Sequence, residues 1–119
     1  MARISKGAVG EVLAARFLRD KGYRIVSANY RCRFGEIDII AEDDEYIAFV
    51  EVKTRAQQSW YTPREAVTEA KQERIYKTAL LFLQEHPTEK QPRFDVIEVI
   101  TDPQKTVGAL RVEHLCNVF

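Results

Sequence analysis

The sequence has no long apolar run, no paired cysteines and no net charge. No stretch approaches the roughly 20 apolar residues that cross a bilayer, and residues 1–12 contain no apolar core of a secretory signal. Cys32 and Cys116 lie far apart and form no CxxC motif. We therefore expect two reduced thiols in a cytoplasmic protein with no membrane partner, and neither a disulfide nor a zinc site.

Internal repeats and low-complexity linkers are also missing. The 119 residues are 45% hydrophobic and 30% charged, enough for one core but too few for two. The sequence therefore predicts a single domain over residues 1–119.

The zero net charge hides an uneven distribution. Residues 1–34 carry a balance of +6, whereas residues 35–51 contain seven acids and no base, a balance of −7. A basic segment beside an acidic one suits a protein that binds phosphates and also binds a cation. Ordinary solvated faces explain the same counts equally well.

Hydrophobic periodicity and turn signals predict two helices and five strands. The helices are expected over residues 5–21 and 62–84, and the strands over residues 23–32, 36–42, 46–54, 94–100 and 109–115. Asp43 and Asp44 mark a hairpin turn, so the second and third strands should be antiparallel neighbours. Thr62, Pro63 and Glu65 form a capping box that starts the second helix. The order αβββαββ predicts an α/β sandwich around a mixed sheet of about five strands, flanked by helices.

Charged residues interrupt the apolar strands. In AFVEVKTR, residues 48–55, Glu51 and Lys53 lie two residues apart and therefore on one face, roughly 6.6 Å apart along the strand. Asp38 lies between two isoleucines of the preceding strand, and hairpin pairing can bring it to Glu51. Two close carboxylates repel unless a cation separates them. Mg²⁺, a hard ion that prefers oxygen ligands, is the expected occupant.

Three further polar residues fall near this position. Lys53 could stabilise negative charge or orient an attacking water. Glu11 has helical spacing from inward-facing alanines, and Gln72 lies on the inner stripe of the second helix. Taken singly, each has a structural alternative: an edge carboxylate, a surface ion pair or a solvated helix position. Their joint arrangement favours a site.

These residues resemble a known family. Asp38 followed by Val50-Glu51-Val52-Lys53 is similar to the D…(D/E)xK signature of the PD-(D/E)xK nuclease superfamily. The segments Gly10-Glu11, Asn29-Tyr30-Arg31, Gly35-Glu36-Ile37-Asp38 and Phe49 to Lys53 resemble the YraN-like family, related to archaeal Holliday-junction resolvases. The likeness covers nearly the whole chain and implies a restriction-endonuclease-like three-layer sandwich. Ile37 replaces the proline in the name of the motif.

The resemblance also implies roles for the site residues. Asp38, Glu51, the Val52 carbonyl and Glu11 would bind the metal, and Lys53 would be the catalytic lysine. Gln72 and Tyr76 fit the Q-x-x-x-Y motif of some nuclease branches, in which the glutamine helps to position the site, although core packing is the simpler explanation for the tyrosine.

The expected function is a Mg²⁺-dependent DNA endonuclease, with Mn²⁺ as a substitute and branched structures such as Holliday junctions as candidate substrates. A homodimer would supply two sites for paired cuts. Lys6, Arg31, Arg33 and Arg55 are the expected contacts to the phosphate backbone. The alternatives are a non-catalytic nucleic-acid-binding module on the same fold and a protein-interaction domain, and the choice between DNA and RNA stays open.

Overall fold

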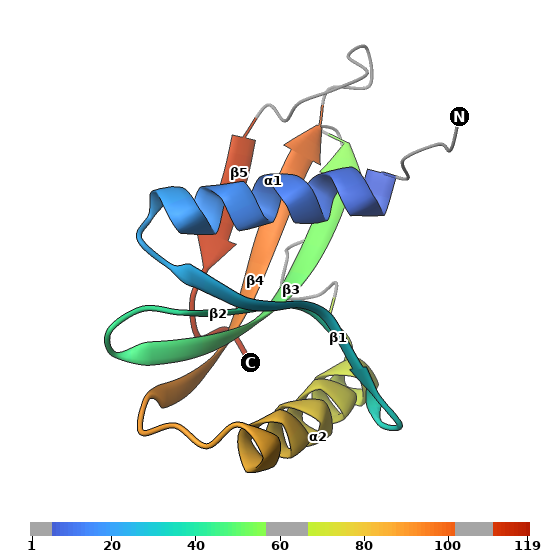
Figure 1. The fold of residues 1–119 in the computed structure, drawn as a ribbon. Coiled ribbons are helices and arrows are strands. Elements are labelled where there is room, and N and C mark those ends of the chain that lie inside the picture. Colours follow the sequence, from blue (N-terminus) through green and yellow to red (C-terminus); the bar gives the residue numbers. More distant parts are fainter. Residues whose placement is uncertain (1–5, 57–66, 102–110) are drawn as a thin grey trace, which may run out of the picture.

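A computed structural model of the chain describes residues 6–56, 67–101 and 111–119, which form a five-stranded sheet and two helices (Figure 1). The elements follow the predicted order αβββαββ. They are α1 (Lys6–Asp20), β1 (Arg24–Cys32), β2 (Gly35–Glu42), β3 (Tyr46–Ala56), α2 (Glu69–Glu85), β4 (Gln91–Thr101) and β5 (Arg111–Leu115).

The sheet is mixed, as the sequence predicts. Its strands lie in the order β1-β2-β3-β4-β5, and every neighbouring pair is antiparallel except β3 with β4. The parallel pair runs in register from Tyr46 opposite Gln91 to Ala56 opposite Thr101. Parallel neighbours need a crossover connection, and α2 lies in the segment that connects these two strands.

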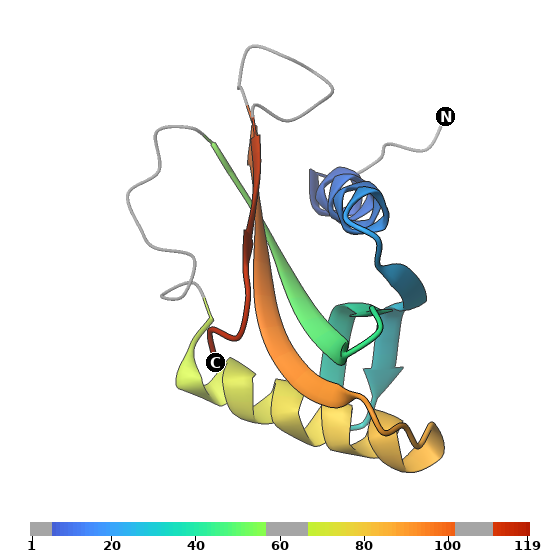
Figure 2. The same ribbon diagram turned by 90° about the vertical axis from the view of Figure 1, so that its left-hand side faces the viewer.

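Each helix packs on a different face of the sheet, which gives three layers (Figure 2). Leu18 of α1 packs with Ile39 and Val50, whereas Phe82 of α2 packs with Ile40 and Phe49. The alternation along β2 and β3 follows from the two-residue period of a strand. All six side chains are at most 3% exposed, so the central strands are buried on both faces.

Helix α2 begins later than the sequence predicts. Thr68 is its N-cap, with an extended backbone at φ −66° and ψ 160°, and the Thr68 hydroxyl accepts a hydrogen bond from the Lys71 amide at 3.2 Å. The predicted cap, Thr62 to Glu65, lies outside the described residues. A second threonine six residues later offers the same chemistry, and sequence alone did not decide between the two. In the described part of the chain, neither helix has the length and apolar character needed to cross a membrane.

The β1–β2 hairpin bends in its middle. The pairing register shifts between Ile25 and Ser27, and Asn29 has a left-handed backbone with φ 55°. A bulge of this kind turns a strand out of the sheet plane. The tip of the hairpin consequently lies beside α2, while its other end lies below α1 (Figure 1).

Candidate active site

Asp38 lies where β2 separates from β3. The last paired residues of the two strands are Ile39 and Val50. One residue further on, the Asp38 Oδ2 accepts a hydrogen bond from the Val52 amide at 2.8 Å. The carboxylate thus binds the backbone of β3 just beyond the last paired residues of the two strands, and this contact fixes Asp38 beside the residue that precedes Val52.

The residue that precedes Val52 is Glu51, and the structure brings Glu51 and Asp38 together. Both line one pocket of about 370 Å³, between the hairpin and the first turns of α2. The other residues that line it are Gly35, Glu36, Lys71, Arg74 and Ile75. Glu51 is 3% exposed, although it is charged. Buried carboxylates need a partner, so the surroundings of each acid indicate what the pocket can do.

The negative charge of the Asp38 carboxylate has few partners to stabilise it. Among the described residues, one donor, the Val52 amide, binds its carboxylate. Burial, and next the charge of Glu51, raise the pKa of Asp38 to about 7, with a smaller contribution from Glu11. The Val52 hydrogen bond and the Lys71 charge act in the opposite direction. Without a bound cation, the Asp38 carboxylate is therefore partly protonated near neutral pH.

Glu51, in contrast, has cationic partners. The ammonium group of Lys71, on the first turn of α2, contacts its Oε1, and the Lys53 Nζ lies 3.4 Å from the same oxygen. Burial lowers the pKa of Lys71, but the hydrogen bond and the charge of Glu51 raise it overall. Lys71 therefore stays charged and neutralises Glu51. Lys53 lies beside Glu51, as the strand pattern predicts, whereas Lys71 is not among the predicted site residues.

Two further glutamates that lie close to Asp38 come from different elements. Glu11 belongs to α1 and Glu36 to β2, and each offers an oxygen so that the three ligand atoms of Glu11, Glu36 and Asp38 lie within 4.8 Å of one another. A second pocket, of about 340 Å³, lies below α1 and is lined by Glu11 and Asp38 among others. Asp38 thus contributes to pockets on the α1 side and on the α2 side.

The position of Glu11 depends on a close approach of α1 to the sheet. A Cβ atom added at Gly10 would lie 2.1 Å from the Thr54 Oγ1 of β3, which is far inside van der Waals contact. Glycine is therefore needed at this point of the helix for α1 to lie so near β3. The next residue, Glu11, is brought to the end of the sheet where Asp38 lies.

Glu36 and Lys71 are not among the predicted site residues, although the sequence carries a signal for each. Glu36 precedes Asp38 by two residues and so shares its side of an ideal strand. Lys71 precedes the buried Ile75 by four residues and Thr78 by seven, which is the spacing of the inner stripe of α2. A charged residue on an apolar stripe needs a partner in the protein, and Glu51 supplies it.

Gln72 lies beside the site rather than in its pocket. Its Nε2 donates a hydrogen bond to the Val67 carbonyl at 3.0 Å, at the start of α2. Tyr76, one turn later, packs edge-on against Phe94 with ring centroids 4.7 Å apart and is 37% exposed. The positioning role of the glutamine stays a prediction, as does the Val52 carbonyl as a metal ligand.

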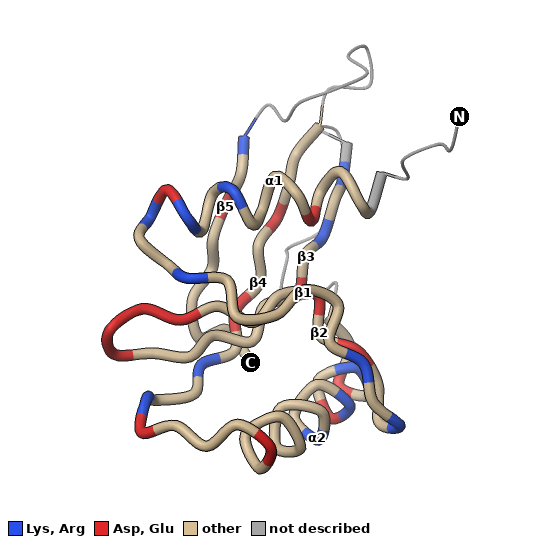
Figure 3. Tube along the Cα trace, viewed as in Figure 1, with Lys and Arg blue, Asp and Glu red and all other residues tan. Residues whose placement is uncertain are grey.

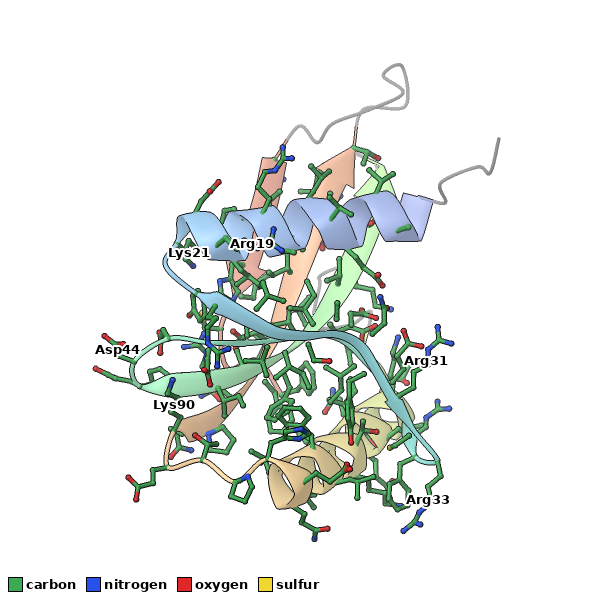
Figure 4. The ribbon with its side chains drawn as sticks, viewed as in Figure 1. Arg19, Lys21, Arg31, Arg33, Asp44 and Lys90 are labelled. Atoms are coloured by element: carbon green, nitrogen blue, oxygen red, sulfur yellow. The ribbon has the colours of Figure 1, made fainter. Side chains whose placement is uncertain are left out.

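The four basic residues expected to contact phosphates differ in their surroundings. Arg31 and Arg33 are exposed at the tip of the β1–β2 hairpin and point away from the sheet (Figure 4). The Arg31 Nε lies 3.0 Å from Glu36. Arg55 is only 12% exposed and forms an ion pair with the buried Glu98, which makes it a poor candidate for a phosphate contact. The side chain of Lys6 lies outside the described residues.

Acidic and basic residues lie close together around the pocket. Basic positions of the hairpin and of α2 lie close to acidic positions of β2 (Figure 3). Of these, Lys71 and Arg74 line the pocket itself together with Asp38 and Glu51. An acidic centre with a basic rim can hold a cation inside and a phosphate at its mouth.

Comparisons with known proteins identify the family. The model of the "Uncharacterised protein family UPF0102" matches residues 10–99. A UPF0102 protein of Nocardia farcinica is 55% identical over 114 residues, which cover 95% of this chain and 87% of the relative. A UPF0102 protein of Caldanaerobacter subterraneus is 42% identical over the full length of both chains. One of Symbiobacterium thermophilum is 48% identical over 95% of this chain and 94% of the relative.

These matches cover the pocket and nearly the whole fold, and they agree with the resemblance that the sequence motifs carry. The chain belongs to the UPF0102 family, the YraN-like group.

Proposed function

We propose that this protein is a metal-dependent endonuclease that hydrolyses phosphodiester bonds of DNA. The observation that carries the proposal is the pair of carboxylates, the half-buried Asp38 and the buried Glu51, in one pocket with basic residues at its rim. A purely structural acid at the position of Asp38 would be expected to have enough donors to stay ionised. Instead the pKa of Asp38 is raised to about 7, first by burial and then by the charge of Glu51, a frequent property of functional acids.

The donor set fits a hard divalent cation. Glu11, Glu36 and Asp38 offer only oxygen ligands, within 4.8 Å of one another, and oxygen ligands with a few carboxylates suit Mg²⁺ or Mn²⁺. Asp38 and Glu51 would hold the ion, with Glu11 and the Val52 carbonyl, and Glu36 is an additional candidate. When bound, such an ion polarises a phosphoryl oxygen and lowers the pKa of a coordinated water.

The protein groups have separate tasks in this proposal. Lys53, held 3.4 Å from Glu51, neutralises the negative charge that develops on the phosphate or orients the attacking water. The Val52 amide keeps the Asp38 carboxylate in place through its hydrogen bond. Water forms the new P–O bond and releases a proton to solvent, and the bond from phosphorus to the leaving sugar oxygen breaks. The leaving oxygen takes a proton from solvent.

The substrate is proposed from the shape and charge of the rim. Arg31 and Arg33 extend from the hairpin tip (Figure 4), where they can contact backbone phosphates without reading bases. One small domain offers limited surface to a branched substrate. A homodimer with twofold symmetry would supply two such hairpins and two sites for paired cuts, and four-way junctions are therefore the first branched substrate to test.

The test is a cleavage assay on linear, flapped and four-way DNA with Mg²⁺, Mn²⁺ or EDTA, with single-stranded RNA as a further substrate. We expect metal-dependent cleavage that Glu51→Gln and Lys53→Met each reduce by about 100-fold or more. Glu113→Gln, which removes the charge of an exposed glutamate on β5, is the matched control and should cleave like the wild type.

One observation favours the alternative, a nucleic-acid-binding module without turnover. Lys71 already neutralises Glu51 in the absence of a metal, so the pocket can persist without one. Salt-sensitive DNA binding that survives Glu51→Gln and Lys53→Met, with no cleavage of any substrate under any metal condition, would support this alternative and contradict the nuclease.

A further inference from the structure

Lys71 has a position that the reaction described above does not explain. It comes from α2, whereas Asp38, Glu51 and Lys53 come from β2 and β3. Its ammonium group crosses the pocket to the Oε1 of Glu51, the oxygen that Lys53 also approaches. The lysine therefore occupies one of the carboxylate oxygens that the proposed metal needs.

A lysine and a divalent cation cannot share Glu51 without cost. Both are cations, and like charges a few ångströms apart in a partly buried site repel strongly. Lys53 lies at 3.4 Å from Glu51, so it already supplies a second positive charge. If a metal binds Glu51, the closer ammonium group, that of Lys71, is the one that must move.

The surroundings of Lys71 allow this movement. Its side chain is 37% exposed, compared with 24% for Lys53 and 4% for Glu51. The ammonium group is carried by a flexible four-carbon chain on the first turn of α2. Arg74, three residues further along α2, lines the same pocket. Lys71 and Arg74 both line this pocket, so a displaced Lys71 would add its charge to that of Arg74.

We propose that Lys71 is a resident counter-ion of Glu51 that a divalent metal displaces, and that the released ammonium group then binds the phosphate of the nucleic acid. This rests on the proposed function, because it assumes the metal site at Asp38 and Glu51. Lys71 thus keeps the acidic pocket folded before the metal arrives and becomes a substrate-positioning residue afterwards. It links metal binding to the capture of the nucleic-acid backbone.

The first test measures Mn²⁺ affinity of the whole protein without DNA, by calorimetric titration. Lys71→Met removes the competing cation, so it should bind Mn²⁺ roughly three- to tenfold more tightly than the wild type. Lys71→Arg keeps a competing charge and should stay near the wild-type affinity. Lys77→Met, which removes an exposed lysine of the same helix paired with Glu73, is the matched control and should not change the affinity.

Two further readouts separate displacement from a merely structural role. At saturating Mn²⁺, Lys71→Met should weaken binding of four-way DNA about threefold or more, whereas Lys71→Arg should restore it. In the wild-type protein, reactivity of Lys71 with an amine-labelling reagent, measured by mass spectrometry, should rise at least about twofold when Mn²⁺ is added, because the ion pair with Glu51 that shields the amine is broken. The Lys77 amine is the internal reference.

The outcomes distinguish this proposal from the nuclease itself. Unchanged Mn²⁺ affinity in Lys71→Met, together with metal-independent labelling of Lys71, would overturn the displacement. Tighter Mn²⁺ binding and metal-dependent labelling without cleavage of any DNA would support the displacement and contradict the nuclease alone. Absence of Mn²⁺ binding in every variant would overturn both.

Discussion

Two aspartates of the sheet, the half-buried Asp38 of β2 and the buried Asp95 of β4, have opposite properties. Asp95 of β4 is fully buried, and its carboxylate is surrounded by donors. Arg93 donates to both oxygens at 2.8 to 3.2 Å, the His114 Nε2 lies 2.7 Å from Oδ2, and the Asn117 amide lies 2.9 Å from Oδ1. Asp38, in contrast, has the Val52 amide as its donor among the described residues.

The pKa values follow from these partners. Burial raises the pKa of Asp95, but the hydrogen bonds from His114 and Arg93 lower it overall. At Asp38 the Val52 hydrogen bond and the Lys71 charge offset burial only in part, and the pKa rises to about 7. Burial alone therefore does not mark a functional carboxylate. The acid with too few donors can take up a cation, whereas the acid with all its donors stabilises the fold.

The largest expected effect is that of Asp95→Ala. This change leaves the 9% exposed Arg93 without its carboxylate and should destabilise the protein by about 3 to 5 kcal/mol, measured by urea unfolding at pH 7. Glu113→Ala, which removes an exposed partner of Arg111, is the control and should cost at most about 1 kcal/mol. Equal stability of the two variants would show that the Asp95 network is not structural.

The next largest effect is that of Asp38→Asn, which should stabilise the protein, by an amount that depends on pH. Because the folded-state pKa of Asp38 is raised, the native protein binds more protons than the unfolded chain, and stability from this group is lost as pH rises from about 4 through about 7. Asp38→Asn can still accept from Val52 but carries no charge. In EDTA it should be more stable than the wild type by about 2 kcal/mol at pH 8 and nearly equal at pH 4.

Urea unfolding at both pH values checks this prediction. Asp95 supplies the contrast, since its lowered pKa gives stability that is present above the ordinary aspartate range and lost as pH falls from that range through the lower folded-state pKa. An Asp38→Asn variant that is less stable than the wild type at pH 8 would show that the ionised Asp38 is compensated after all.

The contrast also explains what the sequence could and could not predict. Local patterns identify the strands, the hairpin turn at Asp43 and Asp44 and the alternation that places Glu51 and Lys53 on one face, because these depend on neighbours in sequence. The convergence of Asp38 on Glu51 follows from hairpin pairing. Donors from distant segments do not: His114 lies 19 residues from Asp95 along the chain.

The same limit applies to Lys71 and Glu36. Lys71 reaches Glu51 across the interface between α2 and β3, and Glu36 joins Glu11 because the hairpin bends. Helix packing and strand curvature arise from the whole core, so neither contact can be derived from one stretch of sequence. Arg55 shows the same limit, since its charge suggests a phosphate contact, which stays a prediction, whereas its ion pair with the buried Glu98 of β4 could not be derived from the sequence.

The smallest effect tests which of the two aspartates receives the metal. Two groups of described residues could hold an ion: Glu11, Glu36 and Asp38, and Asp95 with His114 and Cys116. Mg²⁺ at ten times its dissociation constant should stabilise the wild type by about 1.4 kcal/mol, seen as a rise in Tm. Asp38→Asn should lose most of this rise.

His114→Asn, which alters the Asp95 network, should be less stable from the start yet keep the full rise, because Asp95 is already occupied by Arg93 and the Asn117 backbone amide. A rise lost in His114→Asn but kept in Asp38→Asn would place the metal at Asp95 and reverse the roles of the two aspartates.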